Sequence, residues 1–353
     1  MFNTSRYYGL AALTLTATGL CAQTTARPVA AALADPAVRA PVVQIGAPVL
    51  GHFYDPDQRR IQPVIGVPGS GFFGPALSAG AGALTVAVSP MQDYALTATS
   101  DVALLSMIGL GEVPSEATLL TGSIPGIDRI ALSPAGTFAL VVSSASRRAQ
   151  IFEGFPASPR LLRDLDLSGM SGRLSALAID DAGASPLFAV TSDSTRVYAY
   201  RASSAPAVVY SANLISGMDF LRNTNDVLLA DPAENRVIRV RDIAGSPSAT
   251  VVAGMDSGVT GPLAVAGSTD GTRAFILNRD GTFLSVPLSG GPLSATSCSC
   301  VATQMQRVRG VDTFLLTSST RSPLAVLNSS GDSAQVVFMS GDSPRTAVVG
   351  EEK

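Results

Sequence analysis

The stretch that decides the fold is residues 130–144, which read IALSPAGTFALVVSS. Two short apolar runs flank the tetrapeptide Ser-Pro-Ala-Gly, in which proline and glycine favour a tight turn. Each run is too short for a stable helix and is rich in the apolar residues that are typical of a buried strand. The stretch therefore predicts a hairpin of two buried strands.

The same hairpin pattern recurs along the chain. It returns every 39 to 50 residues, measured between the aromatic or valine residues that open the second strands. Each copy is followed by another apolar pair around a turn, as in residues 148–165, so each unit supplies four strands. The further copies lie at residues 86–101, 177–193 and 263–281, with weaker ones at residues 218–231 and 308–319.

Repeated units of four strands predict an all-β fold, a β-propeller. An isolated four-stranded sheet of this composition would expose two apolar faces, whereas sheets packed around a ring bury both. We prefer seven blades, with six as the alternative. The seventh blade would combine the hairpin at residues 51–67 with a strand from residues 343–353, which would leave no exposed sheet edge.

The unit at residues 130–144 resembles the repeat of secreted bacterial β-propellers of the YVTN and WD40-like type. In that repeat, an apolar strand, a Ser-Pro-x-Gly turn and a second apolar strand recur. The resemblance covers roughly residues 84–340. The chain contains no tryptophan and therefore lacks the Trp-Asp dipeptides of WD40 repeats. The resemblance implies a fold and no particular chemistry.

The N-terminus predicts export. Arg6 precedes the apolar run at residues 9–20, which is shorter than the roughly 20 residues of a membrane span, so we interpret residues 1–22 as a signal peptide. Residues 23–49 predict a flexible Ala/Pro-rich linker, and residues 50–353 the propeller domain. We expect an exported, periplasmic or extracellular protein with no transmembrane segment in the mature chain. Lipidation of Cys21 is an alternative that the order of its neighbours disfavours.

The composition excludes several classes of function. With 24 basic and 27 acidic residues, a net charge of -3 and no basic run, the chain is not expected to bind nucleic acid. His52 is the only histidine and the motif G-x-S-x-G does not occur, so neither a multi-histidine metal site nor a serine-hydrolase site is expected. Residues 69–74 match G-x-G-x-x-G, but the following proline and glycines disfavour the helix that nucleotide binding needs.

Aspartates follow several of the predicted second strands. Asp101, Asp193, Asp231 and Asp280 each come four to seven residues after the residue that opens the strand. Such turns share one face of a propeller, where carboxylates around the channel could bind a hard cation such as calcium. Aspartate is also favoured in tight turns because it accepts backbone N–H groups, which explains these positions without a ligand. We predict these four as candidate ligand-binding residues, with calcium as the candidate ion and no other cofactor.

The pair Cys298 and Cys300 lies in the turn-rich sequence SATSCSC. Residues two apart in a straight strand are too far apart for a disulfide, so a bond between them needs a turn. Because an exported protein meets an oxidising compartment, we predict a disulfide between Cys298 and Cys300. Free thiols, or a redox or metal role, are the alternatives.

The leading functional prediction is a non-catalytic, exported β-propeller that acts as a binding or scaffold module through its loop face. Its partner would be a protein, peptide or glycan, and we expect a monomer. The alternative is a lactonase-like hydrolase or lyase with an aspartate-lined, cation-binding central channel. We favour the first because the sequence offers few catalytic residues.

Overall fold

The computed structural model describes residues 48–80, 82–99, 105–111, 114–201, 205–331 and 333–340. The predicted signal peptide and nearly all of the predicted linker lie outside this part of the chain. The described residues belong to the compact unit Gly46–Lys353. Among them, no helix combines the length and hydropathy of a membrane-spanning segment.

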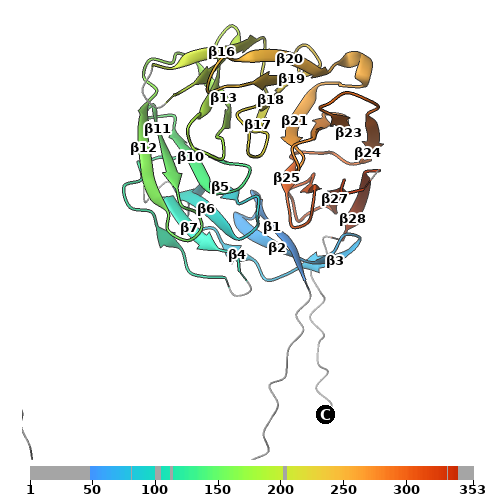
Figure 1. Cartoon of the computed structure of the whole chain (residues 1–353). Helices are drawn as coiled ribbons and strands as arrows, with labels where there is room; N and C mark the ends of the chain where they lie inside the picture. The colour runs from blue at the N-terminus through green and yellow to red at the C-terminus, as the bar shows by residue number, and fades with distance from the viewer. Residues whose placement is uncertain are drawn as a thin grey trace, which may run out of the picture. The chain divides into compact units, whose positions relative to one another are not determined.

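The described strands form seven antiparallel sheets of four strands each, arranged as a ring around a central axis (Figure 1). The predicted all-β propeller with seven blades is confirmed. In blades 2 to 7 the four strands of a sheet follow one another in the chain, so the sequence repeat and the blade coincide. The first strands β5, β17, β21 and β25 lie nearest the axis in Figure 1.

The strands are as follows. Blade 1 holds β1 (Val49–Asp55), β2 (Arg60–Val67), β3 (Ser70–Phe73) and β4 (Leu77–Ser78), and blade 2 holds β5 (Ala83–Val88), β6 (Tyr94–Thr99), β7 (Leu105–Gly109) and β8 (Thr118–Leu119). Blade 3 holds β9 (Arg129–Leu132), β10 (Phe138–Ser143), β11 (Arg148–Glu153) and β12 (Arg160–Asp166), and blade 4 holds β13 (Arg173–Ala178), β14 (Leu187–Thr191), β15 (Thr195–Ala199) and β16 (Ala207–Ala212). Blade 5 holds β17 (Gly217–Phe220), β18 (Val227–Asp231), β19 (Arg236–Arg241) and β20 (Ser248–Ala253), followed by the short 3-10 helix η1 (Met255–Ser257). Blade 6 holds β21 (Pro262–Gly267), β22 (Arg273–Asn278), β23 (Thr282–Pro287) and β24 (Ser294–Ser297), and blade 7 holds β25 (Gln306–Arg307), β26 (Thr313–Leu315), β27 (Leu324–Asn328) and β28 (Gln335–Met339).

Burial changes from strand to strand within a blade. The second strand of blade 5, β18, is buried at every position, and β10 in blade 3 is buried at all but its first. The outer strand β12 is exposed at five of its seven positions. Second strands are covered on both sides by neighbouring blades, and this explains the continuous apolar runs in the sequence.

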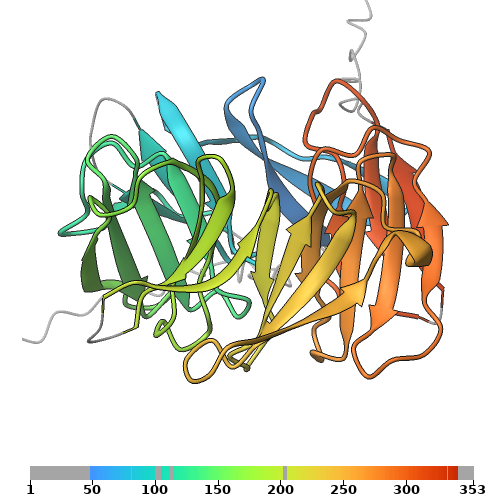
Figure 2. The same cartoon turned by 90° about the horizontal axis from the view of Figure 1, so that it is seen from above.

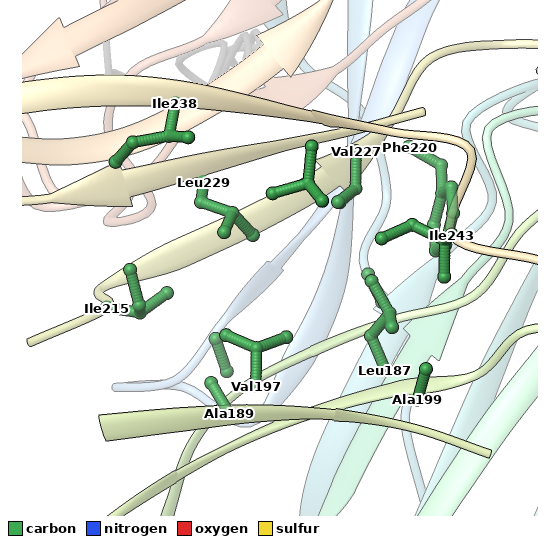
Figure 3. Close-up of a cluster of buried hydrophobic side chains, with 13 residues drawn as sticks. Leu187, Ala189, Val197, Ala199, Ile215, Phe220, Val227, Leu229, Ile238 and Ile243 are labelled. Atoms are coloured by element: carbon green, nitrogen blue, oxygen red, sulfur yellow. The ribbon is translucent and has the colours of Figure 1, made fainter. Parts of the chain in front are cut away.

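The core consists of seven apolar clusters, one at each interface between neighbouring blades. Figure 3 shows the cluster between blades 4 and 5, where Leu187 and Val197 face Val227 and Leu229. Burial of apolar surface contributes roughly 25 cal/mol per Å², so these interfaces are the main source of stability. The core is therefore distributed around the ring.

Blade 1 is built differently from the sequence expectation. Its four strands all come from residues 49–78, and residues 343–353, predicted to complete the blade, lie outside the described part of the chain. β3 pairs with the C-terminal half of β2, and β4 pairs with its N-terminal half. The two short strands therefore lie end to end along the same edge of β2. The blade closes the ring through the interface in which Phe53 and Val64 pack with Leu315 and Val326 of blade 7.

Side chains of blades 2 and 7 cover the inner edge of β1. The only strand that pairs with β1 among the described residues is β2. On the other edge, the backbone N–H of His52 donates to Oε1 of Gln92 at 2.6 Å, and its C=O accepts Nε2 of Gln306 at 2.8 Å. The C=O of Leu50 accepts the backbone N–H of Arg309 at 2.9 Å. The glutamines thus satisfy backbone groups that would otherwise be buried without partners.

Candidate functional site

Strand direction sorts the turns onto two faces of the ring. Because neighbouring strands are antiparallel, the turn between strands one and two of a blade lies at the opposite end from the turn between strands two and three. Figure 2 shows the strands running between these two faces. We name the faces after these turns, the first-turn face and the second-turn face.

Five first turns share one hydrogen bond. In each, the backbone N–H of the opening residue donates to the C=O five positions later. The pairs are Ser89 with Tyr94, Ser133 with Phe138, Leu221 with Asp226, Ser268 with Arg273, and Val308 with Thr313, at 2.9 to 3.0 Å. Because these five turns are closed in the same way, the residue that follows the opening residue is structurally equivalent in all five.

The residue after the opening position lines a cavity in all five turns. These residues are Pro90, Pro134, Arg222, Thr269 and Arg309, and the cavity has a volume of about 370 Å³. Because its lining comes from blades 2, 3, 5, 6 and 7, the cavity lies over the central axis at the first-turn face. We call it the mouth cavity. A concave site with converging polar groups is the usual form of a ligand-binding site.

Hydrogen bonds between blades hold the mouth cavity in shape. The carboxylate of Asp181 in blade 4 accepts the backbone N–H groups of Ala135 in blade 3, at 2.7 Å, and of Asn223 in blade 5, at 3.0 Å. Asp312 of blade 7 accepts both the backbone N–H and the hydroxyl of Thr269, at 2.7 and 2.8 Å. These contacts join the first turns of blades 3, 4 and 5 to one another and those of blades 6 and 7 to each other, which preorganises the site for a ligand.

Among the described residues, three arginines line the mouth cavity, and no aspartate or glutamate does. Arg307 donates to the C=O of Gly267, lies over the ring of Phe314 at 5.0 Å and approaches Asp312 at 3.7 Å. Arg309 makes a long hydrogen bond of 3.4 Å to a backbone carbonyl. In the described part of the chain, no hydrogen bond or ion pair engages the guanidinium of Arg222. The arginines therefore retain donors for an anionic ligand.

A smaller cavity, about 220 Å³, shares Pro90 and Arg307 with the mouth cavity and contains Asp219. The carboxylate of Asp219 accepts the backbone N–H of Gly267 at 3.0 Å. Desolvation raises the pKa of Asp219 to about 6, against the opposing effect of the Arg307 charge. Asp219 thus changes charge near neutral pH, beside one of the mouth arginines.

The predicted aspartates lie elsewhere. Asp193 is exposed in the β14–β15 turn, and Asp231 is fully buried, accepting the N–H of Glu234 at 3.2 Å beside Arg236. Asp280 accepts the N–H of Thr282 at 2.8 Å, which lowers the pKa of the aspartate. All three lie on the second-turn face, in different blades, and the structure does not bring them to the mouth cavity.

Asp101 lies outside the described residues. Within the part of the chain that the structure describes, no group of three or more histidine, cysteine, aspartate or glutamate side chains could hold a metal ion. The ligand-binding role of the four aspartates, with calcium as the candidate ion, remains a prediction.

His52 is a buried, structural residue. Burial lowers its pKa to about 4, with Arg309 acting in the same direction, and its Nδ1 has no hydrogen-bond partner. The imidazole is therefore neutral at physiological pH. The glycine-rich residues 69–74 form β3 and its flanks rather than the start of a helix.

Cys298 and Cys300 are joined by a disulfide, with their Cα atoms 5.1 Å apart. Ser299 between them has a φ of 49°, so the backbone makes the turn that such a bond needs. Cys298 is buried in the cluster between blades 6 and 7. The bond therefore fixes the turn that follows β24, and both cysteines pack in this cluster.

The chain matches no protein-family model and no curated protein. Among solved structures, it is similar to a functionally unknown protein from Desulfotomaculum acetoxidans, with a TM-score of 0.57 at 13% identity over 83% of this chain and 99% of that one. It is also similar to Hsv2 of Kluyveromyces lactis, with a TM-score of 0.51 at 9% identity over 71% and 75%. At these identities the likeness concerns the fold. The chain is a seven-bladed β-propeller.

The sequence reasoning missed the mouth arginines. Arg222 and Arg309 belong to the two weaker copies of the repeat, where neither turn opens with Ser-Pro. Only the backbone hydrogen bond that closes each turn places both at the position of Pro90 and Pro134. That position is proline in blades 2 and 3 but threonine in blade 6, so no uniform residue marked the two arginines in the sequence.

Proposed function

We propose that this protein is a binding module that holds an acidic peptide segment, free or part of a protein, at the mouth cavity. The main support is the lining of the cavity, which in the described part of the chain contains three arginines and no carboxylate side chain. A guanidinium presents its donors in a planar fork that matches a carboxylate, and such charge-assisted pairs are strong. Acidic side chains or a C-terminal carboxylate fit this arrangement.

Apolar groups beside the arginines favour a peptide. Met91 and Val311 line the cavity and are 51% and 59% exposed, so the aliphatic parts of a peptide have a surface to pack against. Phe220, the one aromatic residue among the described residues of the lining, is only 1% exposed and offers no ring face. Sugars are commonly recognised by stacking on such faces, which makes a glycan the weaker candidate.

The proposed setting is outside the cytoplasm. It is supported by the signal-like residues 1–22, by the disulfide between Cys298 and Cys300, and by the likeness of residues 130–144 to the repeat of secreted YVTN-type propellers. A periplasmic or extracellular binding module can use a rigid loop face of this kind without a cofactor.

The test is fluorescence anisotropy with a labelled hexapeptide of alternating glutamate and leucine, and with its lysine and leucine counterpart. The acidic peptide should bind and the basic peptide should not. The double variant R222Q/R309Q should bind the acidic peptide at least tenfold more weakly. The matched control is R196Q, which removes an exposed arginine of β15 that does not line the cavity. Equal weakening by both variants, or binding of both peptides, would refute the proposal.

A further inference from the structure

A second arginine-lined cavity lies on the opposite face of the ring. It has a volume of about 280 Å³ and lies between blades 3 and 4. Arg129 and Arg173 line it from the first residues of β9 and β13, and Arg147 lines it from the β10–β11 turn. First strands begin on the face that carries the second turns, so these three arginines converge although they come from separate elements. We call this cavity the interblade cleft.

The arginines of the interblade cleft have spare hydrogen-bonding capacity. Among the described residues, no hydrogen bond or ion pair engages the guanidinium groups of Arg129 and Arg173. Arg147 makes one long hydrogen bond, 3.4 Å, to the C=O of Ser168. The cleft therefore gathers three positive charges, and most of their donors are not used by hydrogen bonds within the described part of the chain.

Opposing negative charge in the cleft is small. Asp128 is the one carboxylate that lines the cleft in the part of the chain that the structure describes, and it already accepts the backbone N–H of Ser144 at 2.9 Å. Asp193 lies in the second turn of blade 4, on the same face, but does not line the cleft. Three arginines against one engaged carboxylate leave a net positive site, which attracts an anion.

The floor of the cleft is apolar. Val142, Leu167, Met170 and Val190 line it, and each is less than a tenth exposed, while Leu174 is partly buried beside them. These side chains come from β10, β13, β14 and the segment after β12. A charged rim above an apolar floor fits a molecule that has one anionic end and one aliphatic end.

We propose that the interblade cleft binds a small amphiphilic anion, with its carboxylate or phosphate held by Arg129, Arg147 and Arg173 and its aliphatic chain on the apolar floor. Bidentate pairing with guanidinium groups accounts for the oxyanion. The site is separate from the mouth cavity, because the two lie on opposite faces and share no lining residue. The same chemistry could reach the cleft as a free molecule or as the headgroup of a lipid.

Isothermal titration calorimetry with n-hexyl phosphate tests the proposal, with hexanol as the uncharged control. We expect n-hexyl phosphate to bind, hexanol not to bind measurably, and R129Q/R173Q to weaken binding at least tenfold. R196Q changes an arginine of blade 4 that does not line the cleft, and it should bind n-hexyl phosphate as the unchanged protein does. Co-sedimentation with vesicles of phosphatidylcholine and phosphatidylglycerol distinguishes the source. If the unchanged protein sediments with the vesicles and the double variant does not, the cleft binds a lipid headgroup. If the unchanged protein does not sediment, the cleft binds a free anion.

The thermal melting temperature shows whether the double variant is folded. If it is not, R147Q takes its place, since Arg147 is exposed in a turn, and it should weaken binding about threefold to tenfold. The proposal is overturned if neither n-hexyl phosphate nor the vesicles bind the unchanged protein. It is equally overturned if a folded variant that lacks these arginines binds as well as the unchanged protein.

Discussion

Arg222 and Arg309 occupy the same position of the first turn in blades 5 and 7. Each follows the residue whose N–H closes its turn, and each lines the mouth cavity. The equivalent position is proline in blades 2 and 3. The hydrogen bond that closes the turn uses backbone atoms only, so the side chain at this position is free to vary without loss of the blade. The ring thus provides a rigid frame on which a binding surface is set by single turn residues.

The glutamine that covers β1 gives a stability prediction. Gln92 accepts the N–H of His52 and donates to the C=O of Arg307 at 2.7 Å. In Gln92→Leu both groups lose their partner while buried, which costs roughly 1 to 3 kcal/mol for each group. We expect chemical denaturation to show a loss of about 2 to 6 kcal/mol for the two groups together. Gln58→Leu, which removes an exposed hydrogen bond to Thr320, is the control and should change stability by less than about 1 kcal/mol.

Ring closure through blade 1 gives a second prediction. A chain that starts at Gly69 lacks β1 and β2, and with them Leu50, Phe53 and Val64 of one apolar cluster and Ile61 of another. We expect this chain to be insoluble or to melt far below one that starts at Pro48. Thermal denaturation followed by circular dichroism compares the two. Equal melting temperatures would mean that the ring is complete without this hairpin.

The pH dependence of stability follows from two groups whose effects oppose each other. The pKa of Asp219 is raised from 3.8 to about 6, so the folded protein binds the extra proton and stability falls as pH rises through this window. The pKa of His52 is lowered from 6.5 to about 4, so the unfolded chain binds the extra proton and stability rises with pH over nearly the same window. We expect the contributions to offset each other between about pH 4 and pH 6.5.

Single variants separate the two contributions. Relative to the unchanged protein, Asp219→Asn should gain stability as pH rises from 4 to 6.5, because only the His52 contribution remains. His52→Gln should lose stability over the same range. Urea denaturation at several pH values measures both slopes. If stability changes with pH in both variants as it does in the unchanged protein, the pKa values of Asp219 and His52 are not shifted in these directions.

The disulfide prediction concerns the protein in solution. Purification without reductant should give a protein whose intact mass is two hydrogen masses below that of the reduced form, since Cys298 and Cys300 are bonded through a turn. Intact mass spectrometry before and after reduction measures this difference. Alkylation of both thiols without reductant would contradict it.

How much could be predicted from the sequence depends on how local each feature is. The blades could be predicted from residues 130–144 and their copies, because the apolar runs and the Ser-Pro-Ala-Gly turn act within a few residues. The way in which the inner edge of β1 is covered could not be predicted, because Gln92 and Gln306 reach β1 from other blades. Asp231 and Asp280 accept backbone N–H groups of their own turns, which is the role expected of aspartate in tight turns without a ligand.

The two arginine-lined cavities were beyond the reach of sequence patterns. Arg129 and Arg173 are far apart in the chain and meet only because two first strands begin on the same face. Arg222 and Arg309 show no shared motif, and only the backbone register of their turns makes them equivalent. Convergence of this kind is a tertiary property, so these residues had no local signal to distinguish them from exposed arginines such as Arg196.

The most direct test of the mouth cavity is a reversal of its charge. R222E/R309E keeps both turns intact, because their closing hydrogen bonds use backbone atoms. Fluorescence anisotropy with the two labelled hexapeptides then compares the variant with the unchanged protein. We expect the variant to lose binding of the glutamate and leucine peptide and to gain binding of the lysine and leucine peptide, with the preference reversed by at least tenfold. A folded variant that still prefers the acidic peptide would contradict it, since binding would then not depend on the arginines at the first turns.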